Sequence, residues 1–200
     1  MNNDKLKEKN INMKPRIAVF ASGNGSNFEA LAKACDEGVI DAEIVLCVTD
    51  KPGAFVVKRA EKYNIPVIEF RPKDFNSKED YEEMLVKRLQ ESKVELICLA
   101  GYMRIVGKTL LNSFRNKIIN IHPSLLPAFP GVDAIGQALD YGVKIFGVTI
   151  HYVDETLDGG KIIAQAAIPY SGDNRDEIEP LIHRQEHILY VDTVKKLLDR

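Results

Sequence analysis

The chain has 200 residues, which fits one domain with a full hydrophobic core. Its formal net charge is −2, with scattered lysines and arginines, and no stretch approaches the roughly 18 apolar residues of a membrane span, so neither a nucleic acid nor a membrane is an expected partner. Residues 1–13 lack the apolar centre of a secretion signal, and the cysteines lie far apart in apolar runs, so we expect reduced thiols, a cytoplasmic location and a small-molecule substrate.

Short β-branched runs alternate with longer helical patterns after a polar lead-in, residues 1–13, which we expect to be disordered. Strands are predicted near residues 16–20, 43–49, 66–69, 94–100, 117–122, 145–153 and 161–168. Helices are predicted near residues 27–37, 54–63, 78–92, 108–114, 133–141 and 177–198. The alternation predicts a single α/β domain over residues 14–200, with a Rossmann-like, mostly parallel twisted sheet and helices on both faces. The last two strands are too close in sequence for a crossover helix, so an antiparallel hairpin should form the C-terminal end.

Three positions indicate helix ends within this pattern. Ser77, followed three residues later by Asp80, resembles a capping box, in which the serine side chain accepts a hydrogen bond from the later N–H. Gly38 and Gly142 follow helical patterns where a helix end favours a left-handed residue. These signals predict the start of the third helix and the ends of the first and fifth.

A glycine-containing loop, residues 21–27, follows the first predicted strand. Its small residues let backbone N–H groups approach an anion at the positive end of a helix dipole, which favours a phosphate site. A dinucleotide site is the rival interpretation, because Gly23 and Gly25 follow a strand and Asp50 ends the next one, as a ribose partner would. Phe28, however, fills the third glycine position, where bulk opposes close packing of helix on strand. A tight turn without a ligand also stays open.

The predicted strand near residues 117–122 ends in an amide and an imidazole two positions apart. Asn120 and His122 would lie on one face of the strand, and Pro123 should end it because proline cannot donate to a sheet. Both side chains then lie at the carboxyl end of a strand, where open α/β sheets bind their ligands. The alternative is an ordinary strand end whose histidine bonds a loop carbonyl.

A possible metal motif lies in the last helix. His183, Glu186 and His187 match the H-x-x-E-H pattern of inverted zinc metalloproteases. Zinc catalysis needs a third protein ligand, and only Asp192 and Asp199 follow the pattern as carboxylates. We therefore expect no metal, and interpret this helix as one that presents polar residues to solvent or to a cleft.

Several segments, taken together, resemble the glycinamide ribonucleotide transformylase family: residues 22–27, 99–105, 120–127, 157–160 and 185–187. The resemblance extends over residues 15–192, with the motifs in family order and at family-like spacing. It implies transfer of the formyl group of 10-formyltetrahydrofolate, as co-substrate, to the amine of glycinamide ribonucleotide in purine synthesis.

The resemblance also implies roles for individual residues. The implied ribonucleotide contacts, through phosphate, ribose or amine, are Gly25, Ser26, Asn27 and Glu186. The implied folate-binding residues are Lys78, Met103, Arg104, Ile105, Val106 and Asn120. The backbone of the 103–106 segment would hold the pterin, and the loop 154–158 would close over it. The chain would thus have a phosphate-binding N-terminal half and a folate-binding, catalytic C-terminal half.

Some positions depart from the family pattern. Lys78 replaces an arginine, so a bidentate contact becomes a point charge. His183 replaces lysine or glutamine and would touch phosphate. Asp133 and Ile135 depart from a histidine-containing loop, which leaves the ligand contacts of that loop open. By the same resemblance, the bond before Pro127 is expected to be cis.

The expected chemistry needs three groups. Formyl transfer to an amine passes through a tetrahedral oxyanion, for which Asn120 supplies an amide donor and His122 a protonatable donor. Asp158 supplies a carboxylate that favours the imidazolium form. Because no serine or cysteine is placed as a nucleophile, direct transfer without a covalent enzyme intermediate is expected.

Related activities and a different class of function remain as alternatives. Methionyl-tRNA formyltransferase and 10-formyltetrahydrofolate hydrolase share the Asn-x-His and Asp-Gly signatures, but each carries an added domain that does not fit within this chain. The alternatives to the transferase are 10-formyltetrahydrofolate hydrolase and, from a different class, a non-catalytic nucleotide-binding regulator. We expect a monomer or a homodimer.

Overall fold

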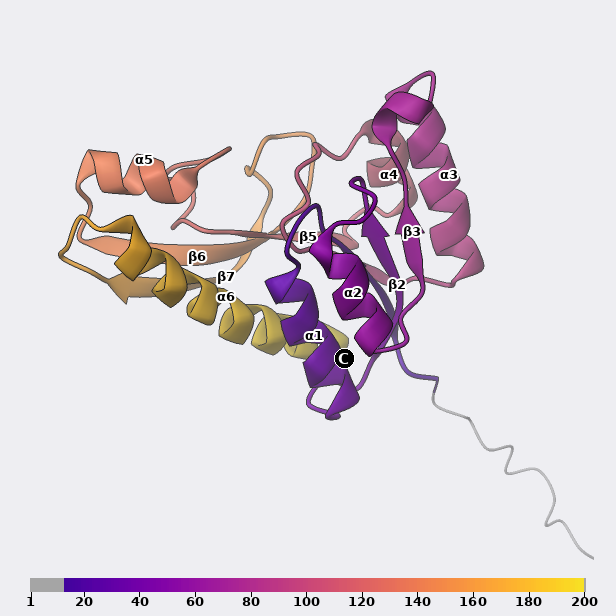
Figure 1. Ribbon diagram of the computed structural model, residues 1–200, viewed down its shortest axis with the longest axis horizontal. Coiled ribbons are helices and arrows are strands. Elements are labelled where there is room, and N and C mark those ends of the chain that lie inside the picture. The colour runs from indigo at the N-terminus through magenta and orange to yellow at the C-terminus, as the bar shows by residue number, and fades with distance from the viewer. Residues whose placement is uncertain (1–12, 200) are drawn as a thin grey trace, which may run out of the picture.

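The computed structural model describes residues 13–199 (Figure 1). The strands are β1 (Arg16–Phe20), β2 (Glu43–Thr49), β3 (Val67–Glu69), β4 (Leu96–Leu99), β5 (Ile118–His122), β6 (Ile145–Tyr152) and β7 (Ile162–Pro169). The helices are α1 (Ser26–Asp36), α2 (Phe55–Lys62), α3 (Lys78–Glu91), α4 (Lys108–Ser113), α5 (Ala134–Tyr141) and α6 (Arg175–Leu198), with a 3-10 turn, η1 (Pro72–Asp74). Every predicted strand and helix is present, with ends that shift slightly. The predicted disordered lead-in falls outside the described residues, except for Met13.

The seven strands form one sheet in the order β3-β2-β1-β4-β5-β6-β7. The strands from β3 to β5 pair in parallel, whereas β6 is antiparallel to both β5 and β7. The mostly parallel sheet and the C-terminal hairpin are therefore confirmed. β4 is buried along its whole length, as expected of a parallel strand covered on both faces.

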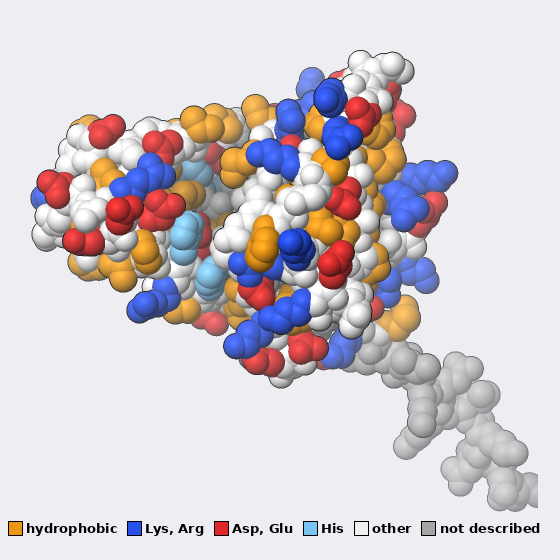
Figure 2. Space-filling view, viewed as in Figure 1, with side chains coloured by type: hydrophobic (Ala, Val, Ile, Leu, Met, Phe, Trp, Pro, Cys, Tyr) orange, Lys and Arg blue, Asp and Glu red, His pale blue; other side chains and the backbone are white. Residues whose placement is uncertain are grey.

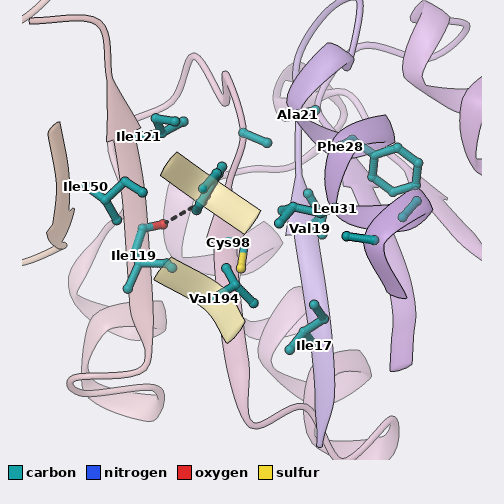
Figure 3. Close-up of a cluster of buried hydrophobic side chains, with 14 of the residues drawn as sticks. Ile17, Val19, Ala21, Phe28, Leu31, Cys98, Ile119, Ile121, Ile150 and Val194 are labelled. Atoms are coloured by element: carbon teal, nitrogen blue, oxygen red, sulfur yellow. Dashed lines mark hydrogen bonds between the residues drawn. The ribbon is translucent and has the colours of Figure 1, made fainter. Parts of the chain in front are cut away.

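Helices cover both faces of the sheet, and each face has its own hydrophobic cluster. In one cluster, α1, α2, α5 and α6 pack on the face that carries Val19 and Cys98; Figure 3 shows Leu31 of α1 and Val194 of α6 on this side. In the other, α3 and α4 pack on the face that carries Phe20 and Leu99. Adjacent residues of one strand thus face opposite cores, as the two-residue period of a strand requires.

The long helix α6 places a tyrosine hydroxyl inside the first of these clusters. Tyr190 is fully buried, and its hydroxyl donates to the carbonyl of Leu99 at 2.9 Å, with a longer contact to the carbonyl of Ile119 at 3.5 Å. α6 is therefore attached by a polar contact to β4 and β5, the two strands whose carboxyl ends lead into the site described below.

The predicted helix ends are confirmed. Ser77 Oγ accepts a hydrogen bond from the N–H of Asp80 at 3.1 Å at the start of α3. Gly38 and Gly142 have φ values of 72° and 77°, in the left-handed region that glycine adopts without a Cβ penalty.

The chain order changes direction between β1 and β4, and two loops meet there. β1 is followed by the loop into α1, and β4 by residues 100–107, which lead into α4. The N–H of Ser22 donates to the carbonyl of Gly101 at 3.0 Å, so the loops are in contact. Such a switch point at the carboxyl ends of parallel strands forms the ligand crevice of open α/β sheets. None of the helices within residues 13–199 is long and apolar enough to cross a membrane.

Candidate active site

The loop between β1 and α1 is shaped for close approach of a ligand. Gly25 has a φ of 74°, and a Cβ there would lie 2.6 Å from Val56 Cγ2, so a larger residue would be both strained and crowded. α1 begins at Ser26, and its first N–H groups have no partner within the helix. Arg59 of α2 donates to the backbone and side-chain oxygens of Asn24 at 2.8 and 3.0 Å, which fixes the outer turn of the loop.

Helix α6 brings a buried carboxylate against this loop. Glu186 accepts a hydrogen bond from Asn27 Nδ2 at 3.1 Å and contacts His183 Nδ1 at 2.8 Å. The bond to Glu186 is the main reason that the pKa of His183 lies above its ordinary value; partial burial opposes the rise and the nearby Glu179 adds to it. Asn27 and Glu186, implied as contacts of one substrate, thus touch each other directly.

Two buried polar atoms near Glu186 have no protein hydrogen-bond partner within residues 13–199: Asn27 Oδ1 and His187 Nε2. Burial lowers the pKa of His187, against an opposing effect of Glu186, so the ring is neutral near pH 7. Buried polar groups are normally satisfied. Asn27 Oδ1 and His187 Nε2 therefore leave hydrogen-bonding capacity unused in this part of the described chain.

The segment after β4, residues 100–107, has exposed apolar side chains on a backbone that hydrogen bonds hold in place. Met103 and Ile105 are 67% and 71% exposed, whereas Val106 is buried in the core and can meet a ligand only through its backbone. The N–H of Met103 donates to Ser22 Oγ at 2.8 Å. Arg104 Nε donates to Asp50 at 2.8 Å, so its side chain is held by the protein rather than by a ligand.

Lys78 lies at the other end of this segment. It is the first residue of α3, and a Cβ at Gly107 would lie 2.8 Å from Lys78 Cε, so the lysine stem packs directly against the segment. The structure therefore places Lys78 beside Gly107, the residue that follows the implied folate-binding segment 103–106.

A second carboxylate lies at the carboxyl end of β5, among an amide and two imidazoles. Asn120 and His122 emerge on one face of β5, and the antiparallel register places His151 of β6 directly opposite Asn120. Asn120 Nδ2 lies 3.2 Å from His151 Nε2 and 3.4 Å from Asp158 Oδ1. Asp158 Oδ2 lies 3.4 Å from His122 Nδ1, and Asp158 Oδ1 lies 3.6 Å from His151 Nε2.

Hydrogen-bond partners assign the protons of the two imidazoles. His151 Nδ1 lies 2.9 Å from the carbonyl of Tyr152, which can only accept, so Nδ1 carries the proton and Nε2 is free to accept from Asn120. His122 Nε2 lies 2.8 Å from the carbonyl of Phe129, while its Nδ1 faces Asp158. The carbonyl of Phe129 can only accept, so His122 Nε2 carries a proton, and Nδ1 lies toward the Asp158 carboxylate.

Asp158 is held as a carboxylate. Its burial alone would raise its pKa, but the contact with His151, the N–H of Gly131 and the nearby His122 together lower the pKa below its usual value. The N–H of Gly131 donates to Asp158 Oδ2 at 2.8 Å, and this bond joins the 154–158 loop to the loop that precedes α5. Asp158 itself has a φ of 48°, a conformation that aspartate tolerates better than most residues.

Sequence reasoning missed two members of this cluster, His151 and Gly131. His151 sits in an apolar strand whose local pattern marks it only as part of a buried β6. The signal that could have found it is the antiparallel pairing of β6 with β5, which puts His151 and Asn120 on one face. Figure 2 shows histidine side chains gathered along the boundary between the α5 end of the molecule and the α1 and α2 side.

Comparison with known protein families identifies the family of proteins to which this chain belongs. The model of the formyl transferase family matches residues 15–194, nearly all of the described chain. The chain belongs to the formyl transferase family.

Relatives within this family match most of the length of this chain. Phosphoribosylglycinamide formyltransferase of Bacillus subtilis is 53% identical over 92% of this chain and 94% of its own length. The trifunctional purine biosynthetic protein adenosine-3 of Drosophila melanogaster is 43% identical over 86% of this chain, which corresponds to 13% of the fly protein. The crystal structure of glycinamide ribonucleotide transformylase 1 from Geobacillus kaustophilus superposes with a TM-score of 0.90, at 48% identity, over 92% of this chain and 99% of that one.

Within this formyl transferase, the positions that depart from the expected pattern have structural explanations. Asp133 pairs with Arg175 Nη1 at 2.7 Å, which ties the loop before α5 to the start of α6. Ile135 is buried in the core and serves packing. His183 contacts Glu186 and so lies beside the first loop. The bond between Leu126 and Pro127 is cis.

The rival motifs have other uses in this member of the family. Asp50, the candidate ribose partner, bonds Ser22 and Arg104 instead. His183 and Glu186 of the zinc pattern bond each other, and within residues 13–199 no group of three His, Cys, Asp or Glu side chains could hold a metal ion.

Proposed function

We propose that this chain is a phosphoribosylglycinamide formyltransferase, which transfers the formyl group of 10-formyltetrahydrofolate to the amine of phosphoribosylglycinamide and releases tetrahydrofolate. The observation that carries the proposal is the cluster of Asn120, His122, His151 and Asp158 at the carboxyl end of β5. Its side chains would supply the oxyanion donor, the proton donor and the carboxylate that amide-forming formyl transfer requires. The substrate is inferred from the names of the relatives.

The ribonucleotide would bind between α1 and α6. Its phosphate would accept hydrogen bonds from the backbone of Gly25, Ser26 and Asn27, at the positive end of the α1 dipole. Glu186 would accept from the ribose hydroxyls or from the amine, next to the unpartnered oxygen of Asn27. The orientation of Glu186 by His183 supports this assignment, because a preorganised acceptor loses little freedom on binding.

The folate would lie across the segment after β4. Exposed Met103 and Ile105 would flank the pterin and the backbone of residues 103–106 would hydrogen-bond it, with Lys78 near the acidic end of the molecule and the 154–158 loop above it. The proposed arrangement divides the chain into a phosphate-binding N-terminal half and a folate-binding, catalytic C-terminal half within a single domain. Three unpaired cysteines support a reducing, cytoplasmic location.

The proposed reaction is a direct transfer. The amine nitrogen attacks the formyl carbon, the carbonyl oxygen becomes an oxyanion, and Asn120 Nδ2 donates to it in place of the long 3.4 Å contact with Asp158. Asp158 stabilises the charge on protonated His122, which then gives its Nδ1 proton to N10 and becomes neutral. The amine loses a proton to water or to the carboxylate, the bond from carbon to N10 breaks, and N10 takes up a proton.

The test is an absorbance assay of deformylated folate, with 10-formyltetrahydrofolate present and phosphoribosylglycinamide either added or omitted. Turnover that requires the amine is expected. Turnover without the amine would indicate a hydrolase, and ligand binding without turnover would indicate a regulator. Wild-type activity of His122→Ala, or a trapped acyl-enzyme, would contradict the proposed chemistry.

A further inference from the structure

Asp50 has a use that neither the dinucleotide interpretation nor the catalytic cluster explains. It follows β2 and is 4% exposed, yet it lies outside the hydrogen bonds of the sheet. One carboxylate oxygen accepts from Ser22 Oγ at 2.5 Å, and the other accepts from Arg104 Nε at 2.8 Å. A buried carboxylate with both oxygens engaged is a fixed point from which neighbouring groups can be oriented.

The contact with Ser22 reaches the backbone of the segment after β4. Ser22 is buried, and its hydroxyl has a single hydrogen, which it donates to Asp50. The oxygen lone pairs of Ser22 are then available to the N–H of Met103, which donates at 2.8 Å. The carboxylate of Asp50 thus determines the direction of the serine hydroxyl, and the serine fixes the backbone of Met103.

The contact with Arg104 adds a second attachment one residue later. The Arg104 side chain is 46% exposed, whereas that of Asp50 is 1% exposed, so the pair joins the surface segment to the interior. The far end of the segment is attached in a similar way, because buried Glu82 accepts from the N–H of Gly107 at 2.6 Å.

Between these attachments, Val106 is packed in the core, whereas the residues before it are exposed. The side chains of Met103 and Ile105 point to solvent, so the position of the backbone depends on polar groups beneath it. A change in those groups would therefore move the ligand-facing backbone without removing any side chain that touches the ligand.

We propose that Asp50 is a positioning residue for folate binding, which acts through Ser22 and Arg104 on the backbone of residues 103–106. This inference rests on the proposed function, because it takes that segment as the pterin-binding segment. Asp50 does not contact the reacting atoms, and its effect falls on one substrate and not on the other.

The test compares the KM values of the two substrates in Asp50→Asn, which keeps the shape of the side chain and removes its charge. The KM for 10-formyltetrahydrofolate should rise about tenfold, the loss expected when a charge-assisted hydrogen bond is weakened, while the KM for phosphoribosylglycinamide stays within about twofold. Ser22→Ala should raise the same KM. A purely structural defect would lower the active fraction, and hence the apparent kcat, with both KM values unchanged.

Glu43→Gln is the matched control. It removes the charge from the Arg16 and Glu43 pair, joined at 3.0 Å at the opposite ends of the same two strands, β1 and β2. This variant should leave both KM values unchanged.

Amide hydrogen exchange gives a second measurement that needs no turnover. Without ligands, the N–H groups of residues 103–107 should exchange faster in Asp50→Asn than in wild type or Glu43→Gln. If wild type shows no amine-dependent turnover, the proposed function is wrong, and the exchange result alone then decides whether Asp50 orders the segment. If wild type is active but Asp50→Asn leaves the folate KM unchanged, or raises both KM values equally, the positioning role is wrong.

Discussion

The two carboxylates of the site differ in how completely the protein surrounds them. Asp158 contacts four groups, and the second nitrogen of each neighbouring imidazole, on His122 and His151, bonds a backbone carbonyl. Glu186 contacts His183, which is 46% exposed, and Asn27, whose oxygen has no protein partner in the described chain. The first cluster is complete without a ligand, whereas the second is not.

This difference indicates which cluster should control the rate of formyl transfer and which should control the affinity for the ribonucleotide. A buried cluster with fixed dipoles needs little rearrangement during reaction beyond the exchange of the long contact between Asn120 and Asp158, which lowers the barrier for chemistry. A cluster with unsatisfied polar atoms gains most when a ligand supplies the missing partners. We therefore expect changes around Asp158 to reduce kcat, and changes around Glu186 to raise the KM for the ribonucleotide.

The strongest test of this division is removal of single side chains from the first cluster. Asn120→Ala should lower kcat by about 100-fold to 1000-fold, the usual cost of losing an oxyanion donor. Asp158→Ala should lower kcat by a similar factor because His122 loses its carboxylate partner, and both variants should leave the KM for the ribonucleotide nearly unchanged. Steady-state kinetics at saturating folate measures both. Asp140→Ala is the control, because this exposed carboxylate lies in α5, outside the cluster and the 154–158 loop. A large rise in KM with normal kcat would contradict the division.

The next largest effect is expected at His151, which does not face the substrate but orients Asn120. His151→Leu removes the acceptor for Asn120 Nδ2. Misplacement of a catalytic group by about 1 Å can lower the rate about 100-fold. His151→Gln, whose amide oxygen can still accept, should retain more of the activity. Circular dichroism checks that both variants fold. Equal kcat for both variants and wild type would show that Asn120 needs no partner on β6.

A smaller effect on a different parameter is expected at the second cluster. Glu186→Gln should raise the KM for phosphoribosylglycinamide about 10-fold to 100-fold, because a charged acceptor is replaced by a neutral one, while kcat at saturation changes little. Calorimetric titration of the ribonucleotide gives the same quantity without turnover. Glu179→Gln, two turns earlier in α6 and more exposed, serves as the control. A fall in kcat as large as that of Asp158→Ala would remove the distinction between the clusters.

The smallest effect concerns stability and its pH dependence. The pKa of His183 is raised in the fold, chiefly by Glu186, so its stabilising contribution is present below the ordinary histidine pKa and is lost as the pH rises through the raised value. Wild type should therefore exceed His183→Gln in free energy of unfolding by about 0.5 kcal/mol in mild acid, because an exposed pair contributes little, and by less in mild alkali. Urea unfolding at both pH values measures the difference. A larger difference in alkali would contradict the assignment.

Local sequence signals were sufficient for the parts of the molecule that depend on neighbours in the chain. The period of β5 and Pro123 predict that Asn120 and His122 lie on one face at a strand end, and Gly38 and Gly142 predict the left-handed residues after α1 and α5. The alternation of strands and helices predicts the sheet and the two covered faces.

Contacts between distant segments could not be predicted in this way. His151 belongs to the cluster only because β6 runs antiparallel to β5 in one particular register, and register is set by the whole sheet. Asp50 suggested a ribose partner because its place after β2 fits that motif, and only the position of Arg104, after β4, reveals its different use. The grouping of Lys78 with residues 103–106 came from family resemblance rather than from pattern.

The buried hydroxyl of Tyr190 sets a limit on the fold in alkaline solution. Its complete burial raises its pKa well above the ordinary value, and burial raises the pKa of the neighbouring Cys98 as well. The unfolded chain can release these protons at a lower pH than the native protein can. A high pH therefore shifts the folding equilibrium toward the unfolded state. Because the hydroxyl of Tyr190 bonds β4 and β5, the strands that carry the site, its ionisation should coincide with loss of structure there.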